Sequence, residues 1–288
     1  MKFLRLIAIA LLCLAAPASA FWQSRDSNYN TNIAAGGGGG CAQATTWLGR
    51  VTVDATHQAA YTTLICGAVT DGWWSKLDGL YILNTQTSTA ALLNLISTSF
   101  PLTNNGALTF TADHGYAQSN NTSYLSTTFA ASGGTNYTQN SASFGGWTKD
   151  TALIGAGYVS PIWGDGDQQE NRILLANNAG GSGYYTAINQ PNYAPCSGAN
   201  SVYVGLWILN RTGSTASQLY NNGSTIGSAC ATASQARNAI TWRTSDSGGN
   251  SSEAMAMLFM GSALTGTDIT NIGSRYGAWN TTISGGNP

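Results

Sequence analysis

The spacing of apolar residues along the chain changes near position 100. Before it, apolar side chains recur at helical spacing in three runs, which begin at Asp54, Asp71 and Ser88. Asp and Ser are favoured helix N-caps because their side chains accept hydrogen bonds from first-turn amides. The apolar positions are Tyr61, Leu64, Ile65 and Ala68, then Trp74, Leu77, Leu80 and Tyr81, then Ala91, Leu92, Leu95 and Ile96. This pattern predicts a helical segment over 43–98 that packs on the part of the chain that follows.

From residue 107 onward the pattern is that of strands. Short apolar runs are bounded by Gly, Asn, Ser and Asp, at 107–112, 123–129, 141–147, 151–159, 171–177, 183–189, 201–209, 217–227, 239–244 and 253–261. In one of them, Asn222-Gly223 supplies the positive φ angles of a type I′ hairpin turn. Strands at short, even spacing with no helices between them predict a mainly β fold, an antiparallel jelly-roll β-sandwich over 99–288.

The N-terminus has the features of a secretory signal peptide over residues 1–20. Lys2 and Arg5 precede an apolar run that is too short to span a bilayer, and small residues end it. We expect cleavage near Ala20 and a secreted, periplasmic or extracellular location, with no transmembrane segment later in the chain. Lipidation at Cys13 is disfavoured because the bulky Leu12 precedes it. Residues 21–42 follow as a flexible lead-in with a glycine-rich tether.

Composition limits the partners. Charged residues are 8% of the chain, so Ser, Thr, Asn, Gln and Gly must form much of the surface. Lys2 and Arg5 leave with the signal peptide, so nine of the 11 basic residues remain against 12 acidic ones. A slightly acidic chain without a basic stripe argues against nucleic acid as a partner.

Four cysteines lie beyond the signal peptide, and an even number in an exported chain favours disulfides. We favour the pairs Cys41–Cys66 and Cys196–Cys230, because each pair lies within one expected structural unit. A buried free thiol is the alternative for Cys66, which falls on a helical apolar face. The cysteine spacing does not match a zinc site.

The C-terminal third resembles a known family. QLYNNGSTIGS (218–228), AITWRTSDSG (239–248) and AMLFMGSALTGTDITNI (256–272) follow one another as in concanavalin A-like or laminin-G-like jelly rolls, where an "lY-NG" hairpin and a "G-x-x-L" exit precede a terminal helix. The lead-in and LICGAVTDGWWSKLDGLYIL resemble uncharacterised exported or phage-tail-associated bacterial proteins. Laminin-G-like members mostly bind glycans or proteins, and related members hydrolyse polysaccharides. The resemblance therefore implies the fold more firmly than the function.

Aromatic and acidic residues give the candidate binding site. Sugar rings stack on exposed Trp and Tyr, while neighbouring carboxylates bond the hydroxyls. Trp163, Tyr184 and Tyr185 are the aromatic candidates, with Asp165 and Asp167 beside them. The mid-strand Trp147, Trp207 and Trp242 are expected in the core.

The same acidic segment is a candidate metal site. Asp165, Asp167 and Glu170 are hard oxygen ligands on a glycine-flexed loop, which suits calcium, and some laminin-G-like domains bind calcium at a sandwich rim. A plain Asp-Gly turn is the alternative.

Catalytic patterns are weaker. The two glutamates, Glu170 and Glu253, lack the closely spaced acidic partner that a jelly-roll glucanase needs on one strand. Asp113 and His114 could not pair as in a catalytic triad, because adjacent strand residues face opposite sides. Asp113-His114-Gly115 is therefore interpreted as a turn. The leading hypothesis is an exported, non-catalytic, lectin-like module that binds a polysaccharide or surface glycan. A structural or assembly component of a cell surface or virion is the first alternative, and a glycoside hydrolase or lyase is the second.

Overall fold

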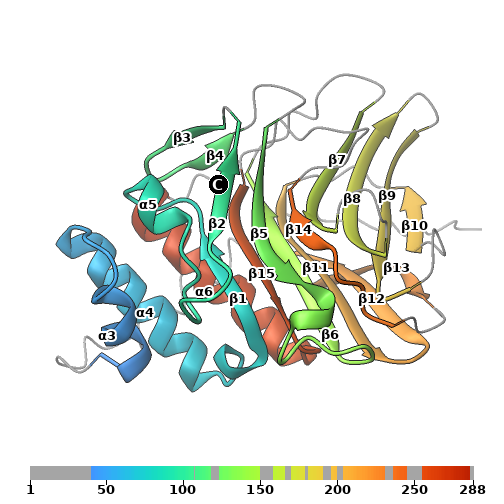
Figure 1. Cartoon of the computed structure of the whole chain (residues 1–288), viewed down its shortest axis with the longest axis horizontal. Helices are drawn as coiled ribbons and strands as arrows, with labels where there is room; N and C mark the ends of the chain where they lie inside the picture. Colours follow the sequence, from blue (N-terminus) through green and yellow to red (C-terminus); the bar gives the residue numbers. More distant parts are fainter. Residues whose placement is uncertain are drawn as a thin grey trace, which may run out of the picture. The chain divides into compact units, whose positions relative to one another are not determined.

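The computed structural model describes residues 40–106, 108–117, 123–149, 158–165, 170–178, 181–190, 196–199, 204–230, 236–244 and 255–285. The predicted signal peptide and nearly all of the lead-in lie outside these ranges. Within them the chain forms two antiparallel sheets packed face to face, and helices cover the outer side of one sheet (Figure 1). The prediction of a mainly β sandwich with a helical segment packed on it is confirmed.

Sheet A contains eight of the described strands, in the order β13-β12-β11-β6-β15-β4-β3, with β1 also paired to β15. They are β1 (Leu77–Ile82), β3 (Thr109–Thr111), β4 (Gly115–Ala117), β6 (Ala142–Thr148), β11 (Gly205–Gly213), β12 (Ala216–Asn221), β13 (Ser224–Cys230) and β15 (Met255–Gly261). All residues of β1 and β15 are buried. A strand with both faces covered needs apolar or small residues at nearly every position, and LDGLYI and MAMLFMG meet that requirement.

Sheet B contains seven of the described strands, in the order β10-β9-β8-β7-β14-β5-β2. They are β2 (Leu102–Asn105), β5 (Tyr124–Ala130), β7 (Tyr158–Gly164), β8 (Asn171–Asn178), β9 (Gly181–Ile188), β10 (Cys196–Ala199) and β14 (Thr241–Arg243). Buried and accessible residues alternate along β5. That alternation is typical of a strand with one face on a core and one toward solvent.

The inter-sheet core is built around Trp242. Its ring packs edge-to-face against Phe144, Phe129 and Tyr137, with centroids 4.9, 5.0 and 5.4 Å away. Phe144 comes from sheet A and Phe129 from sheet B, so the indole joins the two sheets directly. Edge-to-face aromatic pairs add about 0.5–1.5 kcal/mol each beyond the area they bury. The expectation that Trp207 and Trp242 belong to the core is confirmed.

The helix-side core lies between sheet A and the helices α3 (Ala42–Leu48), α4 (Ala55–Thr70) and α6 (Gly266–Ser284), which Figure 1 shows along one side of the strands. Tyr61 of α4 contacts Trp279 of α6 with ring centroids 4.6 Å apart. Arg275 of α6 crosses α4 at Gly67, where a Cβ would collide with the guanidinium, and forms a two-point ion pair with Asp71. Because Gly67 has no side chain, Arg275 can lie across α4 at this point and reach Asp71.

Caps define the ends of these helices. Asp54 accepts a hydrogen bond from the His57 amide at the start of α4, as predicted. Thr265 and Asp268 form a reciprocal capping box at the start of α6, and Gly285 ends that helix in the left-handed region at φ 67°. Lys76 Nζ lies 2.5 Å from Asp268 Oδ2, which ties the start of α6 to the chain segment just before β1.

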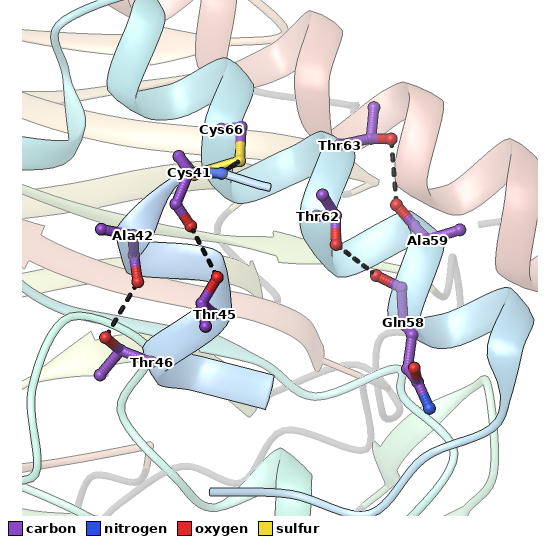
Figure 2. Close-up of a disulfide and its surroundings, with 9 residues drawn as sticks. All are labelled: Cys41, Ala42, Thr45, Thr46, Gln58, Ala59, Thr62, Thr63 and Cys66. Carbon is purple, nitrogen blue, oxygen red and sulfur yellow. Dashed lines mark hydrogen bonds between the residues drawn. A yellow bond between two sulfur atoms is a disulfide. The ribbon is translucent and has the colours of Figure 1, made fainter. Parts of the chain in front are cut away.

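A disulfide joins Cys41 to Cys66, as favoured from the sequence (Figure 2). It attaches α3 to the middle of α4, with Cα atoms 5.5 Å apart. Around it, threonine hydroxyls donate to carbonyls one turn back, including Thr46 to Ala42 and Thr63 to Ala59 (Figure 2). The Cys196 and Cys230 side chains lie outside the described part of the chain. The pairing of these two cysteines therefore stays a prediction. Their strands, β10 and β13, do lie next to each other.

The helical predictions after Asp71 are wrong. Only the short 3-10 helix η1 (Trp74–Lys76) forms there, and Leu77–Ile82 is strand β1 of sheet A. Because every residue of β1 is buried, the spacing of its apolar residues does not distinguish a helix from a strand. The third run forms only α5 (Ser88–Ala91), which Thr87 rather than Ser88 caps. A further 3-10 turn, η2 (Ala131–Gly133), follows β5.

The strand predictions from residue 107 fared better. The hairpin β12–β13 turns at Asn222 and Gly223, with φ angles of 48° and 81°, so the predicted positive φ values are confirmed. The strands β2, β4 and β10 were not predicted. The segments 150–157 and 245–254, which hold parts of two predicted strands, lie outside the described residues.

Candidate functional site

The aromatic residues chosen from the sequence are core residues where their side chains are described. Trp163 is 0% exposed and lies 6.2 Å from Tyr81 and 5.9 Å from Trp242 by ring centroids. Strand β7 runs on through Gly164 and pairs Trp163 with Ile173, which is also in the inter-sheet core. The expectation that Trp163 is exposed for sugar stacking is therefore wrong.

Tyr184 is likewise buried, at 3% exposed, in the same inter-sheet core. It pairs in register with the buried Leu175, so both face sheet A. The expectation that it is exposed is wrong for the same reason. The Tyr185 side chain and residue Asp167 lie outside the described part of the chain, so their predicted roles are carried forward as proposals.

Asp165 directly follows strand β7 and is 2% exposed. Its Oδ2 accepts hydrogen bonds from the side-chain amides of Asn171, at 3.1 Å, and Asn238, at 2.7 Å. Its Oδ1 is buried and has no hydrogen-bond partner among the described residues. Burial raises the pKa of Asp165 to about 6; the two amide donors act in the opposite direction, and the charge of Glu170 adds to the rise.

Glu170 lies close to Asp165, as the sequence predicts for a shared site. Asn238 Nδ2 donates to Glu170 Oε2 at 2.7 Å as well as to Asp165, so one amide bridges both acids. Asn171 is itself held by Tyr137, whose hydroxyl donates to Asn171 Oδ1 at 2.6 Å. Amide side chains thus connect the two acids to the inter-sheet core, and no pattern in the sequence predicts these contacts.

The chemistry open to this pair is limited. Asp165 can hold a proton near neutral pH, and its unpartnered Oδ1 could ligate a cation. A carboxyl that is 2% exposed cannot reach a glycosidic bond, so Asp165 is not placed to act as the acid or base of glycoside hydrolysis. Among the described residues no group of three or more His, Cys, Asp and Glu side chains is placed to hold a metal ion.

A different surface has the features that sugar binding needs. We call it the β5 face: the outward side of β2, β5 and β14 in sheet B. Its side chains are accessible or half-buried and uncharged except for one arginine, and they are Thr103, Asn105, Tyr124, Ser126, Thr128, Thr241 and Arg243. The alternate residues Leu125 and Phe129 point into the inter-sheet core.

Tyr124 and Arg243 form the centre of the β5 face. The Arg243 guanidinium carbon lies 5.5 Å from the centroid of the Tyr124 ring, a cation–π arrangement. Asn105 pairs in register with Tyr124 and donates from Nδ2 to Ser126 Oγ at 2.8 Å. The face therefore combines a half-buried aromatic ring with guanidinium, amide and hydroxyl groups.

The sequence contained a signal for this face. In SYLSTTF the residues Tyr124, Ser126 and Thr128 alternate with Leu125 and Phe129, which assigns the tyrosine to the polar side of its strand. Arg243 follows the core residue Trp242 and so takes the outward side of β14. Their meeting could not be predicted, because it depends on β14 entering the sheet beside β5.

Comparison with known proteins assigns no family. No protein family and no curated protein matches the chain. Among solved structures, the binding domain of botulinum neurotoxin serotype D aligns at 11% identity and a TM-score of 0.48, over 70% of this chain and 52% of that one. The binding domain of Paraclostridial Mosquitocidal Protein 1 aligns at 12% identity and a TM-score of 0.49, so the chain spans about half the length of both.

A third similar structure is domain 4 of AbnA, an extracellular arabinanase from Geobacillus stearothermophilus, in complex with arabinotriose. It aligns at 16% identity and a TM-score of 0.49, over 69% of this chain and 98% of that domain. Similarity of this size does not assign a ligand, so function has to be argued from the surface itself.

The raised pKa of Asp165 predicts how stability depends on pH. A carboxyl whose pKa is raised on folding stabilises most below its ordinary value, and that contribution is lost as the pH rises through about 6. Asp165→Asn, which cannot ionise, should therefore gain about 2–3 kcal/mol of unfolding free energy relative to the unchanged protein between about pH 4 and 7.5. Denaturant unfolding in chelator-containing buffer measures this difference. A difference that stays constant across the range would contradict the ionisation of a buried Asp165.

Proposed function

We propose that this chain is an exported, non-catalytic module that binds a polysaccharide or surface glycan on the β5 face. The observation that carries the proposal is the Tyr124–Arg243 pair, an accessible ring and guanidinium among amide and hydroxyl side chains. The C–H face of a sugar stacks on such a ring, and its hydroxyls bond the neighbouring polar groups.

The location of the helices supports the choice of face. They bury the outer side of sheet A at β1, β6, β11 and β15, so residues such as Leu206, Ile208 and Phe259 are covered there and cannot meet a ligand. The low charge of the chain also fits a ligand recognised through hydroxyl groups rather than through many ion pairs. Tyr185 remains a second aromatic candidate on sheet B.

Export is part of the proposal. The disulfide between Cys41 and Cys66 fits an oxidising compartment, and residues 1–20 have the features of a signal peptide. None of the helices in the described ranges is long and apolar enough to cross a membrane. The proposed organisation is a cleaved signal, a glycine-rich lead-in to residue 42, and one unit that follows. Because 43–98 supplies β1 to sheet A, it belongs to the same core as 99–288.

Affinity for a glycan tests the proposal. After a glycan array has identified a ligand, Tyr124→Ala should weaken its binding by about 2- to 13-fold, since a stacked ring is worth about 0.5–1.5 kcal/mol beyond its buried area. Arg243→Gln should weaken it as well. Isothermal titration calorimetry measures both effects.

The control variants separate this face from other surfaces. Trp163→Phe alters the core and Thr63→Ala alters the exposed side of α4, so both should bind within about twofold of the unchanged protein. Tyr185→Ala tests the second aromatic candidate. Unchanged affinity in Tyr124→Ala, with loss in Tyr185→Ala, would move the site. No binding across the array would favour the structural or assembly role instead.

We also propose that Asp165 and Glu170, together with Asp167, bind calcium. The supporting observation is the buried Asp165 Oδ1 without a hydrogen-bond partner among the described residues, beside a second acid. A bound cation would offset the desolvation of that carboxylate.

Thermal unfolding tests the metal proposal. Millimolar calcium should raise the melting temperature of the unchanged protein by a few degrees, because a ligand that binds the native state alone stabilises it. Asp165→Asn should lose this shift and Glu170→Gln should reduce it. Magnesium, which prefers a smaller octahedral site, should give less. Equal melting temperatures with calcium and with chelator would contradict the proposal.

A further inference from the structure

A second cluster of titratable side chains lies away from the β5 face, at the start of α4. His57 is 5% exposed and lies between two carboxylates. Its Nδ1 is 2.8 Å from Asp54 Oδ1, and its Nε2 is 2.8 Å from Asp113 Oδ1. Asp54 caps α4, whereas Asp113 lies in the turn between β3 and β4 of sheet A. The imidazole therefore bridges the helical layer and the sandwich.

While both aspartates are ionised, only one protonation state of His57 satisfies both contacts. A neutral imidazole has one N–H and one lone pair, so one of the two 2.8 Å contacts would set a lone pair against a carboxylate oxygen. The imidazolium donates from both nitrogens, and hydrogen bonds between charged partners are the stronger ones. Hydrogen bonds from the His57 amide and ring also lower the pKa of Asp54.

The Asp113 backbone is hydrogen-bonded to several other elements. Its amide donates to the Thr85 carbonyl at 3.0 Å, and its carbonyl accepts from Ser284 Oγ, at the end of α6, at 2.6 Å. Lys149 Nζ, just after β6, lies 3.3 Å from the same carbonyl. The Asp113 backbone is in the left-handed region at φ 63°, which Asp and Asn adopt more readily than most non-glycine residues.

The remaining groups around His57 complete the electrostatics. Lys149 is 8% exposed; burial lowers its pKa to about 8, while the charge of Asp113 acts in the opposite direction. From α6, the Trp279 ring lies edge-on 6.3 Å from the imidazole. Gln86 donates to the Asp54 carboxylate at 3.1 Å. The cluster thus contains two carboxylates, Asp54 and Asp113, and two groups that can carry positive charge, His57 and Lys149.

We propose that His57 is a pH-governed clamp between α4 and the β3–β4 turn, closed in its imidazolium form. Loss of one ring proton replaces a charge-assisted hydrogen bond with a repulsive contact. The β3–β4 turn is then no longer held to α4 through Asp113. The end of α6, which binds the Asp113 carbonyl through Ser284, is held less firmly as well. The sandwich core and the β5 face do not depend on this contact, so the clamp loosens the helical layer locally.

The protonation state is tested directly by nuclear magnetic resonance of the ring nitrogens, titrated from about pH 5 to 10. At the acidic end His57 should give two ring N–H protons that exchange slowly with water, and one should be lost as the pH rises. His114, the other histidine, is exposed and serves as the internal reference. A single slowly exchanging ring proton on His57 throughout the titration would overturn the proposal.

Hydrogen exchange tests the clamp itself. At each pH the Asp113 amide is compared between the unchanged protein and His57→Gln, so the intrinsic pH dependence of exchange cancels. At the acidic end the variant should exchange about tenfold faster or more. The ratio should fall toward one as the second ring proton is lost. A ratio that is flat across the titration would contradict the clamp.

Three variants separate the clamp from a merely structural role. Asp113→Asn keeps a residue that tolerates the left-handed backbone but removes the charge, so the pH dependence at this amide should shrink while the fold persists. His114→Gln, next to Asp113 and exposed, should exchange like the unchanged protein. Lys149→Met should leave the His57 titration in place. Loss of the pH dependence in Lys149→Met alone would assign the effect to the lysine and overturn the proposal.

Discussion

Burial of the central strands of sheet A on both faces is the constraint from which the rest of the structure follows. One side packs on sheet B through the inter-sheet core, and the other packs on α3, α4 and α6. Apolar burial stabilises by roughly 25 cal/mol per Å², so a sheet covered twice holds the two layers together. It also explains why β1 and β15 lack the alternation that marks a half-exposed strand.

The same constraint divides the molecule between structure and binding. The helices cover the outer side of sheet A at β1, β6, β11 and β15. Accessible strand residues among those described lie on β2, β5 and β14 of sheet B, and on β3, β12 and β13 at the edges of sheet A. Polar residues that do enter the interior are held by amides, as Asp165 is by Asn171 and Asn238. The His57 contact lies at the other boundary, where the helical layer meets the sandwich. The proposed binding face and the proposed pH-dependent contact therefore lie on separate parts of one fold.

Much of this architecture could be predicted from the sequence, and the exceptions have physical causes. Most strands after residue 107, though not the short β4 and β10, are predictable because Gly and Asn mark their ends. Asn222-Gly223 marks a hairpin turn whatever surrounds it. β1 was mistaken for a helix because total burial removes any period. Trp163 was expected outside because Gly164 and Asp165 suggest a turn, whereas the strand continues to Gly164 and carries the indole inward.

The candidate sites were less predictable, because each depends on strands that are distant in sequence. Tyr124 meets Arg243 only through the pairing of β5 with β14, and His57 meets Asp113 across 56 residues. Local pattern assigns the outward side of a strand but not its neighbour in the sheet. For the same reason, the Asp113-His114 turn was found correctly while its real partner, His57, was missed.

Hydroxyl-radical footprinting with mass spectrometry tests the two-core arrangement most directly, because oxidation follows side-chain exposure. In the native protein Tyr124 and Ile240, which is 40% exposed, should be oxidised readily, while Trp163, Trp207 and Trp242 should be protected until the chain unfolds. Oxidation of Trp163 as fast as that of Tyr124 would show that Trp163 is exposed. That result would contradict its burial in the inter-sheet core.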